Sequence, residues 1–397
     1  MKSVLVAMSG GVDSSVAAAL LLEQGYTCHG IMLIMHGNEK VEDAAEVCTQ
    51  LNIPFYTIDV RENFRSCVIS DFINSYKDGE TPNPCVRCNH EVKLKSILQE
   101  ADKLGIEYIA TGHYACVVHA KDKDLSVCQV EDDLLSGQAS RSQTGSDNAE
   151  YDPLSRTGGR IPADLDNEVI MSEEFGTGVK RNLLYKGKDR QKDQSYMLYR
   201  LSQEQLGRLL LPLGDYSKDE VRRIACRLGL ATADRGDSQD LCFVPDGDYV
   251  SYIEREIGEQ KPGAIVTKQG EVLGTHSGLI NYTVGQRKGL GIALGEPYYV
   301  IRKDKERNEI VLGKEADMYT DSIRVREINL VAVEEIPPDL EVEVQTRYRA
   351  SAVQGRLRQV SADIIDIAFN KKEKAPAPGQ SAVFYIGDMV VGGGIVE

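Results

Sequence analysis

The chain has 397 residues and a mass of 43.8 kDa, which at roughly 100–200 residues per domain predicts two or three domains. Apolar residues make up 42% and charged residues 27%, a composition typical of a globular protein with buried cores. The longest wholly apolar run, Val16–Leu22, is far shorter than the ~20 residues that span a bilayer, so no membrane partner is expected. Since the apolar segment Val4–Met8 is too short for a signal peptide, the expected location is cytoplasmic.

The net charge is 46 − 61 = −15, which argues against a basic nucleic-acid-binding domain, and DNA is not an expected partner. The charges are segregated along the chain, however. Residues 121–181 contain 13 acidic and 7 basic side chains, whereas residues 183–235 contain 11 basic and 7 acidic ones. The second region is therefore compatible with an RNA-binding surface.

Nine cysteines are scattered along the chain. Their odd number and the missing signal peptide argue against a disulfide framework and favour a reducing compartment. The pair Cys85-Val86-Arg87-Cys88 differs from the rest, because its spacing suits metal binding or redox chemistry.

The first hundred residues alternate strands and helices, which predicts a parallel sheet wrapped by helices. Strands are expected at 3–8, 26–35, 55–59 and 108–111, and helices at 14–24, 41–51, 64–76 and 91–104. Ligands of such a sheet bind at the carboxyl ends of its strands. The loops at 9–13 and 111–114 are expected to lie there.

Residues 120–182 interrupt this alternation with a stretch rich in Ser, Gly, Asp and Glu, which we interpret as a mobile insertion. Helices are then expected at 194–201, 202–210 and 217–228, the last opened by a Ser217 cap with Glu220 three residues on. From residue 263 to 397 short strands alternate with Gly-rich turns, which predicts a β-barrel. We expect domains at 1–205, 206–275 and 276–397.

The segment Ser9–Ser15 follows the first expected strand and opens the first helix. Two glycines allow a ligand to approach the backbone, and the N–H groups at a helix start attract an anion such as phosphate. The spacing is neither GxxxxGK[ST] nor GxGxxG, so a Walker-type nucleotide site is not indicated. The simpler alternative is a tight turn with a serine cap.

The motif SGGVDS resembles the pyrophosphate loop of ATP pyrophosphatases, and the rest of the chain resembles the bacterial tRNA-specific 2-thiouridylases. The matching segments keep one order along the chain: TPNPCVRCN (81–89), IATGHY (109–114), KDQSYML (192–198), LPLGDYSKDEVRRIA (211–225), DSQDLCFV (237–244), NYTVGQRKGLGI (281–292), TRYRA (346–350) and PGQSAVFY (378–385). The resemblance implies an α/β fold. It consists of a doubly wound parallel-sheet ATP pyrophosphatase domain (adenine nucleotide alpha hydrolase-like), a small central domain and a C-terminal β-barrel.

The resemblance also implies the activity of a tRNA-uridine 2-sulfurtransferase. ATP adenylylates the C2 oxygen of the wobble uridine with release of pyrophosphate, a sulfur nucleophile attacks C2, and AMP leaves. Activation is needed because a urea-like carbonyl is a poor electrophile. The implied partners are tRNA and a sulfur-donor protein that carries a persulfide, and the implied cofactors are ATP and Mg²⁺.

The same resemblance assigns the nucleotide contacts. They are Ala7, Met8, Ser9, Gly10, Gly11, Val12, Asp13, Ser14, Leu33 and Gly112. Asp13 is expected to help hold Mg²⁺ near the phosphates. For His113 two interpretations stay open, a contact to phosphate or base and a buried structural role.

Cys88 and Cys242 match the two catalytic cysteines of the family. In the family's usual mechanism Cys242 receives persulfide sulfur and presents it to C2, after which Cys88 attacks and leaves a Cys88–Cys242 disulfide. The alternative is that both are ordinary buried cysteines.

Cys85 departs from the family pattern, in which many members have Asp at this place. The three thiols Cys85, Cys88 and Cys242 together resemble the site of thiolases that bind a [4Fe-4S] cluster, where an open iron carries hydrosulfide. The cluster, the persulfide mechanism and a bystander role for Cys85 all stay open. A zinc site is weaker, because a fourth ligand is missing.

Seven residues match tRNA contacts of the family: Asn83, Pro84, Lys192, Asp193, Gln194, Arg347 and Tyr348. Lys and Arg neutralise phosphate, Tyr stacks on bases, and a base that undergoes chemistry must be flipped out. Basic residues at 222, 223 and 227 are either further contacts or solvated surface. The rival functions are an adenylylating synthetase for a small molecule and a non-catalytic Fe–S or RNA-binding protein.

Overall fold

The computed structural model describes residues 2–120, 181–230, 232, 241–244, 247–292 and 295–397. The insertion expected at 120–182 therefore lies almost entirely outside the described residues. Among the residues that are described, no helix is long and apolar enough to cross a membrane.

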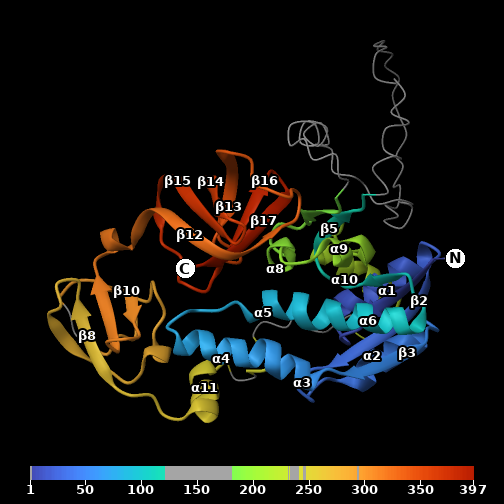
Figure 1. Cartoon of the computed structure of the whole chain (residues 1–397). Helices are drawn as coiled ribbons and strands as arrows, with labels where there is room; N and C mark the ends of the chain where they lie inside the picture. The colour runs from blue at the N-terminus through green and yellow to red at the C-terminus, as the bar shows by residue number, and fades with distance from the viewer. Residues whose placement is uncertain (1, 121–180, 231, 233–240, 245–246, 293–294) are drawn as a thin grey trace, which may run out of the picture.

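A five-stranded parallel sheet forms the N-terminal part (Figure 1), as the alternation of strands and helices predicted. Its order is β3-β2-β1-β4-β7, with β1 at Ser3–Ala7, β2 at Thr27–Ile34, β3 at Phe55–Asp59, β4 at Tyr108–Ala110 and β7 at Leu209–Leu210. The chain leaves β1 on one side to form β2 and β3 and returns on the other side as β4. The crevice at this reversal is the place where such sheets bind ligands.

Helices flank the sheet. They are α1 (Val12–Glu23), α2 (Val41–Gln50), a continuous helix made of α3 (Arg61–Phe64), η1 (Arg65–Ile69) and α4 (Ser70–Lys77), and a second one made of α5 (Pro84–Arg87), η2 (Cys88–Leu94) and α6 (Lys95–Leu104). The last helix begins seven residues before the start expected from the sequence, because Pro84 occupies its first turn, where a missing N–H costs nothing. The cysteine pair 85/88 therefore lies on a helix.

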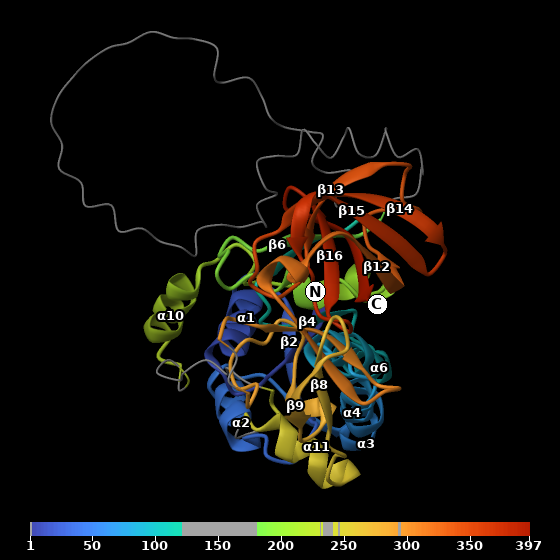
Figure 2. The same cartoon turned by 90° about the vertical axis from the view of Figure 1, so that its left-hand side faces the viewer.

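Short helices follow residue 181: α8 (Ser195–Leu198), α9 (Gln203–Arg208), α10 (Lys218–Arg227) and α11 (Tyr249–Ile257). The capping box predicted from Ser217 and Glu220 is formed. The helix expected at 202–210 ends at Arg208, because the next two residues join the parallel sheet as β7. In both views α11 lies beside α4 (Figure 2), and the Tyr76 and Tyr249 rings are 5.0 Å apart.

The C-terminal β region contains two separate sheets. The first consists of β8 (Gly263–Thr267), β9 (Val272–His276), β10 (Tyr299–Asp304) and β11 (Glu309–Gly313), and the boundary expected at 275/276 falls inside β9. The second consists of β12 (Tyr319–Leu330), β13 (Leu340–Gln345), β14 (Val353–Ser361), β15 (Ile364–Lys374), β16 (Ser381–Ile386) and β17 (Met389–Val396). Pairing of β12 with β17 closes these six strands into a barrel. The predicted fold class is confirmed.

Two strands connect the barrel to the sheet of the N-terminal part. β5 (Ala115–Val118) follows the loop at 111–114 directly, and it pairs with β6 (Leu183–Lys186). β6 in turn pairs with β17 of the barrel.

Candidate active site

The loop between β1 and α1 is closed by its own serines. The backbone N–H of Ser9 donates to Ser14 Oγ at 3.2 Å, and Ser14 Oγ donates to the Gly11 carbonyl at 3.1 Å. Gly10 has φ 72°, a conformation that glycine adopts without strain. The loop thus stays next to the N-terminus of α1, where backbone N–H groups and the helix dipole favour an anion.

The loop at 111–114 packs directly on this turn. A Cβ on Gly112 would lie 2.8 Å from the carbonyl carbon of Asp13 and 2.9 Å from the nitrogen of Ser14, so only glycine fits there. Leu33 lies near the carboxyl end of the neighbouring strand and is buried. The nucleotide contacts expected from the sequence therefore gather around the crevice between β1, β2 and β4.

Asp13 forms a partly buried ion pair with a lysine that the sequence did not single out. Lys218 Nζ lies 2.7 Å and 2.8 Å from the two carboxylate oxygens of Asp13, and the Tyr114 hydroxyl donates to one of them at 2.6 Å. The Lys218 side chain is only 7% exposed. A cation is thus fixed beside the anion-binding turn. The available signals were its place at the start of α10 and within the matching segment 211–225, but 205 residues separate the two partners.

Mg²⁺ fits this site only in part. Proteins commonly hold Mg²⁺ by one or two carboxylates plus substrate phosphates, and Asp13 offers one carboxylate. Both of its oxygens already contact Lys218. Bound phosphates would therefore have to supply most of the ligands.

The segment 192–194 connects to the same crevice through Tyr114. Gln194 Oε1 accepts the Tyr114 N–H at 2.9 Å, and the Gln194 N–H donates to the Tyr114 carbonyl at 2.8 Å. Asp193 accepts the Gly187 N–H at 2.8 Å and the Ser195 hydroxyl at 2.8 Å. Both side chains thus hold protein groups, which orients the segment and the tyrosine that touches Asp13.

The three thiols of interest lie in one neighbourhood. Cys88 on η2 is buried, and burial raises its pKa to about 11, with repulsion from Cys242 and Cys85 adding to the shift. Cys85 and Cys242 expose part of their residue surface, yet the protein around each sulfur also raises its pKa. Burial thus disfavours the thiolate form at all three positions.

Lys93 is a second cation that the sequence analysis missed. It lies on η2 with Cys88, and the i→i+5 pattern of a π-helix places these two residues about one turn apart. Burial lowers the pKa of Lys93, but the charges of Cys88, Cys85 and Cys242 raise it further than burial lowers it. Lys93 therefore stays cationic and stabilises thiolates nearby.

Lys93 also reaches the nucleotide loop. Burial and the charge of Lys93 together lower the pKa of His113 to about 3, so this imidazole is neutral. His113 Nδ1 lies 2.8 Å from Thr111 Oγ1. The loop that packs on Asp13 and the helix that carries Cys88 are thus adjacent.

The thiols do not form a metal site as they are placed. Over the part of the chain that the structure describes, no group of three or more His, Cys, Asp or Glu residues is arranged to hold a metal ion. Cys85, Cys88 and Cys242 are all free cysteines. Within the described residues these three thiols are therefore not arranged as ligands of a single metal ion.

The expected tRNA contacts fall into two groups. Near the helix that begins at Pro84, the buried Tyr196 ring lies 6.0 Å from the ring of Tyr348. Burial raises the pKa of Tyr196, and a hydrogen bond to Asn83 and the charge of Arg347 act against the rise. Asn83, Arg347 and Tyr348 are thus neighbours. The segment 192–194 lies on the Tyr114 side, and the arginines at 222, 223 and 227 are exposed on α10.

Comparison with known proteins covers nearly the whole chain. Residues 2–136 and 171–246 match the tRNA methyl transferase HUP domain, residues 250–314 the tRNA methyl transferase PRC-barrel domain, and residues 320–396 the aminomethyltransferase beta-barrel domain. The chain is 39% identical to the tRNA-specific 2-thiouridylase MnmA of Carboxydothermus hydrogenoformans, covering 100% of this chain and 98% of the relative. It is 38% identical to the tRNA-specific 2-thiouridylase MnmA of Acetivibrio thermocellus, and the match covers 100% of this chain and 99% of the relative.

The fold and the crevice thus define a HUP-domain protein with two appended β domains. The chain belongs to the family of tRNA-specific 2-thiouridylases, whose enzyme class is tRNA-uridine 2-sulfurtransferase. The resemblance derived from the sequence motifs is confirmed.

Proposed function

We propose that the chain catalyses ATP-dependent 2-thiolation of the wobble uridine of tRNA, with release of AMP and pyrophosphate, in the cytoplasm. The observation that supports this most is Lys93. It links the thiols of Cys85, Cys88 and Cys242 to the loop at 111–114, which packs on the anion-binding turn. The thiols proposed for sulfur transfer thus lie next to the residues proposed for ATP binding.

In the first step, the turn from Ala7 to Ser14 and the N-terminus of α1 bind the phosphates of ATP. Lys218 supplies a fixed positive charge for the pyrophosphate that leaves when the C2 oxygen attacks the α-phosphorus. Mg²⁺, bound mainly through ATP and in part by Asp13, would neutralise phosphate charge. The neutral His113 offers a hydrogen bond and no charge.

In the second step, the terminal sulfur of a persulfide on Cys242 attacks C2 and AMP leaves. The Cys88 thiolate then attacks Cys242 Sγ, which forms the Cys88–Cys242 disulfide and leaves the terminal sulfur on C2 as 2-thiouridine. The exposed Cys242 suits a donor protein that delivers persulfide, and the buried Cys88 suits a step inside the site. Two electrons from a thiol reductant restore both cysteines.

The proposed tRNA surface combines Asn83 and Pro84 at the start of α5 with Arg347 and Tyr348 of the barrel region, and with the segment 192–194. Asn83, Arg347 and Tyr348 all lie around Tyr196, which supports placing them on one tRNA-binding surface. In the proposed division of labour, residues 1–205 form the ATP-binding and catalytic domain, 206–275 form a central domain that contributes Lys218 and Cys242 to the reaction, and 276–397 contact tRNA.

Thiolation is tested by incubating tRNA, ATP and a persulfide donor with the purified enzyme and quantifying 2-thiouridine after digestion. We expect pyrophosphate release to require tRNA. Cys242→Ser should abolish 2-thiouridine yet keep tRNA-dependent pyrophosphate release. Pyrophosphate release without tRNA would instead favour a synthetase for a small molecule.

The sulfur source is tested on protein purified without oxygen. The persulfide mechanism predicts activity in protein free of iron and acid-labile sulfide. Stoichiometric iron and sulfide, lost together in Cys85→Ala, would overturn the persulfide step and make Cys85, Cys88 and Cys242 cluster ligands.

A further inference from the structure

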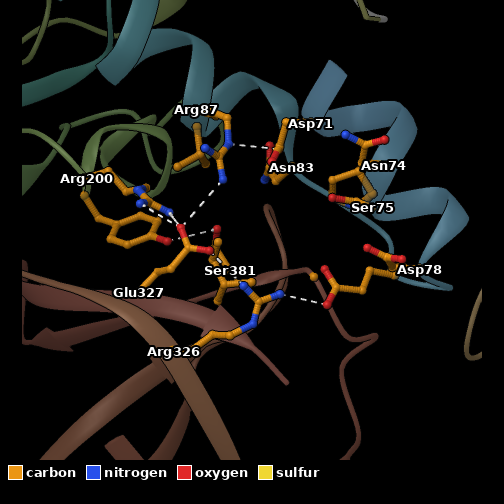
Figure 3. Close-up of a pocket in the computed structure, with 16 residues that line it drawn as sticks. Asp71, Asn74, Ser75, Asp78, Asn83, Arg87, Arg200, Arg326, Glu327 and Ser381 are labelled. Carbon is orange, nitrogen blue, oxygen red and sulfur yellow. Dashed lines mark hydrogen bonds and ion pairs between the residues drawn. The ribbon is translucent and has the colours of Figure 1, made fainter. Parts of the chain in front are cut away.

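A polar pocket of about 210 Å³ lies where the barrel meets the cysteine-bearing helix. Its walls come from α4, the loop and helix around Asn83 and Arg87, the chain at Tyr199–Arg200, and the barrel strands (Figure 3). Four acids and three arginines line it: Asp71, Asp78, Glu80, Glu327, Arg87, Arg200 and Arg326. Because acids outnumber arginines, an anionic ligand is not favoured. The pocket instead holds ion pairs that join its walls.

Glu327 is the centre of these ion pairs. One carboxylate oxygen lies 3.1 Å from both terminal nitrogens of Arg200 and 3.6 Å from Arg87. The other lies 2.8 Å from Arg326. A single barrel carboxylate thus contacts three guanidinium groups, two of which lie outside the barrel.

The backbone is distorted to place this side chain. Glu327 has φ 52°, a left-handed conformation that is uncommon for a residue with a side chain. It lies in the irregular part of β12 between Arg326 and Asn329. A Cβ on Gly394 of the facing strand would lie 2.9 Å from the backbone carbonyl oxygen of Arg326, so glycine there lets the two strands approach closely beside Glu327. Strain held by its surroundings is characteristic of functional positions.

Two of the three arginine partners of Glu327 lie next to residues of the proposed chemistry. Arg87 immediately precedes Cys88, and its other contact is Asp71 of α4 at 2.8 Å. Arg326 also contacts Glu80 at 2.7 Å, on the loop that leads to Asn83. The same loop is held by the barrel at its backbone, where the Thr81 N–H donates to the Pro378 carbonyl at 2.7 Å.

We propose that Glu327 is a positioning residue that couples the barrel, where tRNA docks, to the placement of Cys88. Through Arg87 it fixes the start of the cysteine helix, and through Arg326 and Glu80 it fixes the loop that carries Asn83. The inference rests on the proposed function, in which Cys88 resolves the Cys242-linked sulfur. Without the Glu327 charge, Arg87 keeps Asp71 and the helix stays folded. Its first turn loses the ion pair to the barrel, while the preceding loop keeps its backbone contact at Thr81.

The test uses Glu327→Gln, which keeps the size of the side chain and removes its charge. In a single turnover with persulfide-loaded enzyme, we expect AMP release at the wild-type rate and 2-thiouridine formation slowed about tenfold, since a misplacement of ~1 Å costs up to ~10² in rate. A tRNA–protein adduct that thiols cleave should accumulate, as it should in Cys88→Ser. KM for tRNA should stay unchanged.

The matched control is Glu341→Gln, which removes another Glu–Arg contact of the barrel, at 2.9 Å to Arg356, and should behave as wild type. Wild-type product rate and no adduct in Glu327→Gln would overturn the inference. An equal loss of AMP release and product together with a lower Tm would also overturn it, because it would indicate a purely structural role. If the wild-type enzyme itself forms no 2-thiouridine, the proposed function fails instead.

Discussion

At the scale of single residues, the Asp13–Lys218 pair is the most direct link between structure and ATP chemistry. We expect Lys218→Ala to lower tRNA-dependent pyrophosphate release at least tenfold, about 1.4 kcal/mol in the barrier, because the leaving pyrophosphate loses a fixed cation. The matched control is Lys188→Ala, which removes a half-exposed lysine at 3.0 Å from Glu220 of the same helix. Equal activity of the two variants would contradict a role in catalysis.

The pH dependence of Cys88 follows from its raised pKa. The nucleophilic form is the thiolate, so alkylation of Cys88 by iodoacetamide, measured by peptide mass spectrometry, should rise with pH and reach half of its maximum near pH 11. Lys93→Gln removes the charge that stabilises the thiolate, so its alkylation profile should move to higher pH. A profile that stays in place in Lys93→Gln would show that the lysine does not act on this sulfur.

The same pKa has a consequence for stability. The folded protein holds the Cys88 proton more tightly than an unfolded chain with the ordinary thiol pKa of 9.0. The contribution to the free energy of unfolding is therefore fully present below pH 9. It is lost as the pH rises from 9 toward 11.

At the scale of elements, the contact between the turn at 9–13 and the loop at 111–114 depends on Gly112. We expect Gly112→Ala to separate the two segments, to destabilise the fold by about 1–3 kcal/mol and to weaken ATP binding. Thermal unfolding and ATP titration measure both effects. Gly295→Ala serves as the control, because a Cβ at Gly295 meets nothing within 4 Å. Similar losses in the two variants would contradict the packing argument.

Sequence reasoning was most accurate where the signal is local. Strands such as Phe55–Asp59 and the capping box at Ser217 follow from neighbouring residues, and both are formed. The early start of the cysteine helix was missed, although Pro84 carried a usable signal. Lys93 and Lys218 were missed for a different reason. Their roles depend on partners brought together by the fold, and an isolated lysine in a sequence is most often solvated surface.

At the scale of the whole molecule, the barrel is expected to bind tRNA next to the thiols. Arg347→Ala should raise the Kd for tRNA and reduce the dependence of binding on salt by about one phosphate contact, since an arginine that neutralises phosphate releases a counterion. Binding isotherms at several salt concentrations measure this. Arg356→Ala, on a surface ion pair of the same barrel, is the control. An unchanged salt slope in Arg347→Ala would place the tRNA elsewhere.

The two sheets of the C-terminal region illustrate what a sequence cannot specify. Strand patterns between 263 and 397 predicted β structure correctly, but the pairing of β8 with β11 and of β12 with β17 joins segments tens of residues apart. Alternation of apolar and polar residues gives the face of each strand and leaves its partner undetermined.

The antiparallel pair β5–β6 also makes the molecule open to engineering. Val118 pairs with Leu183, so the two ends of the intervening stretch are fixed about one strand spacing apart, ~4.8 Å, whatever its length. Closing a longer loop costs little, about 0.6 kcal/mol for each doubling. This strand pair is accordingly a suitable place to graft a fluorescent reporter, whose termini would be held one strand spacing apart.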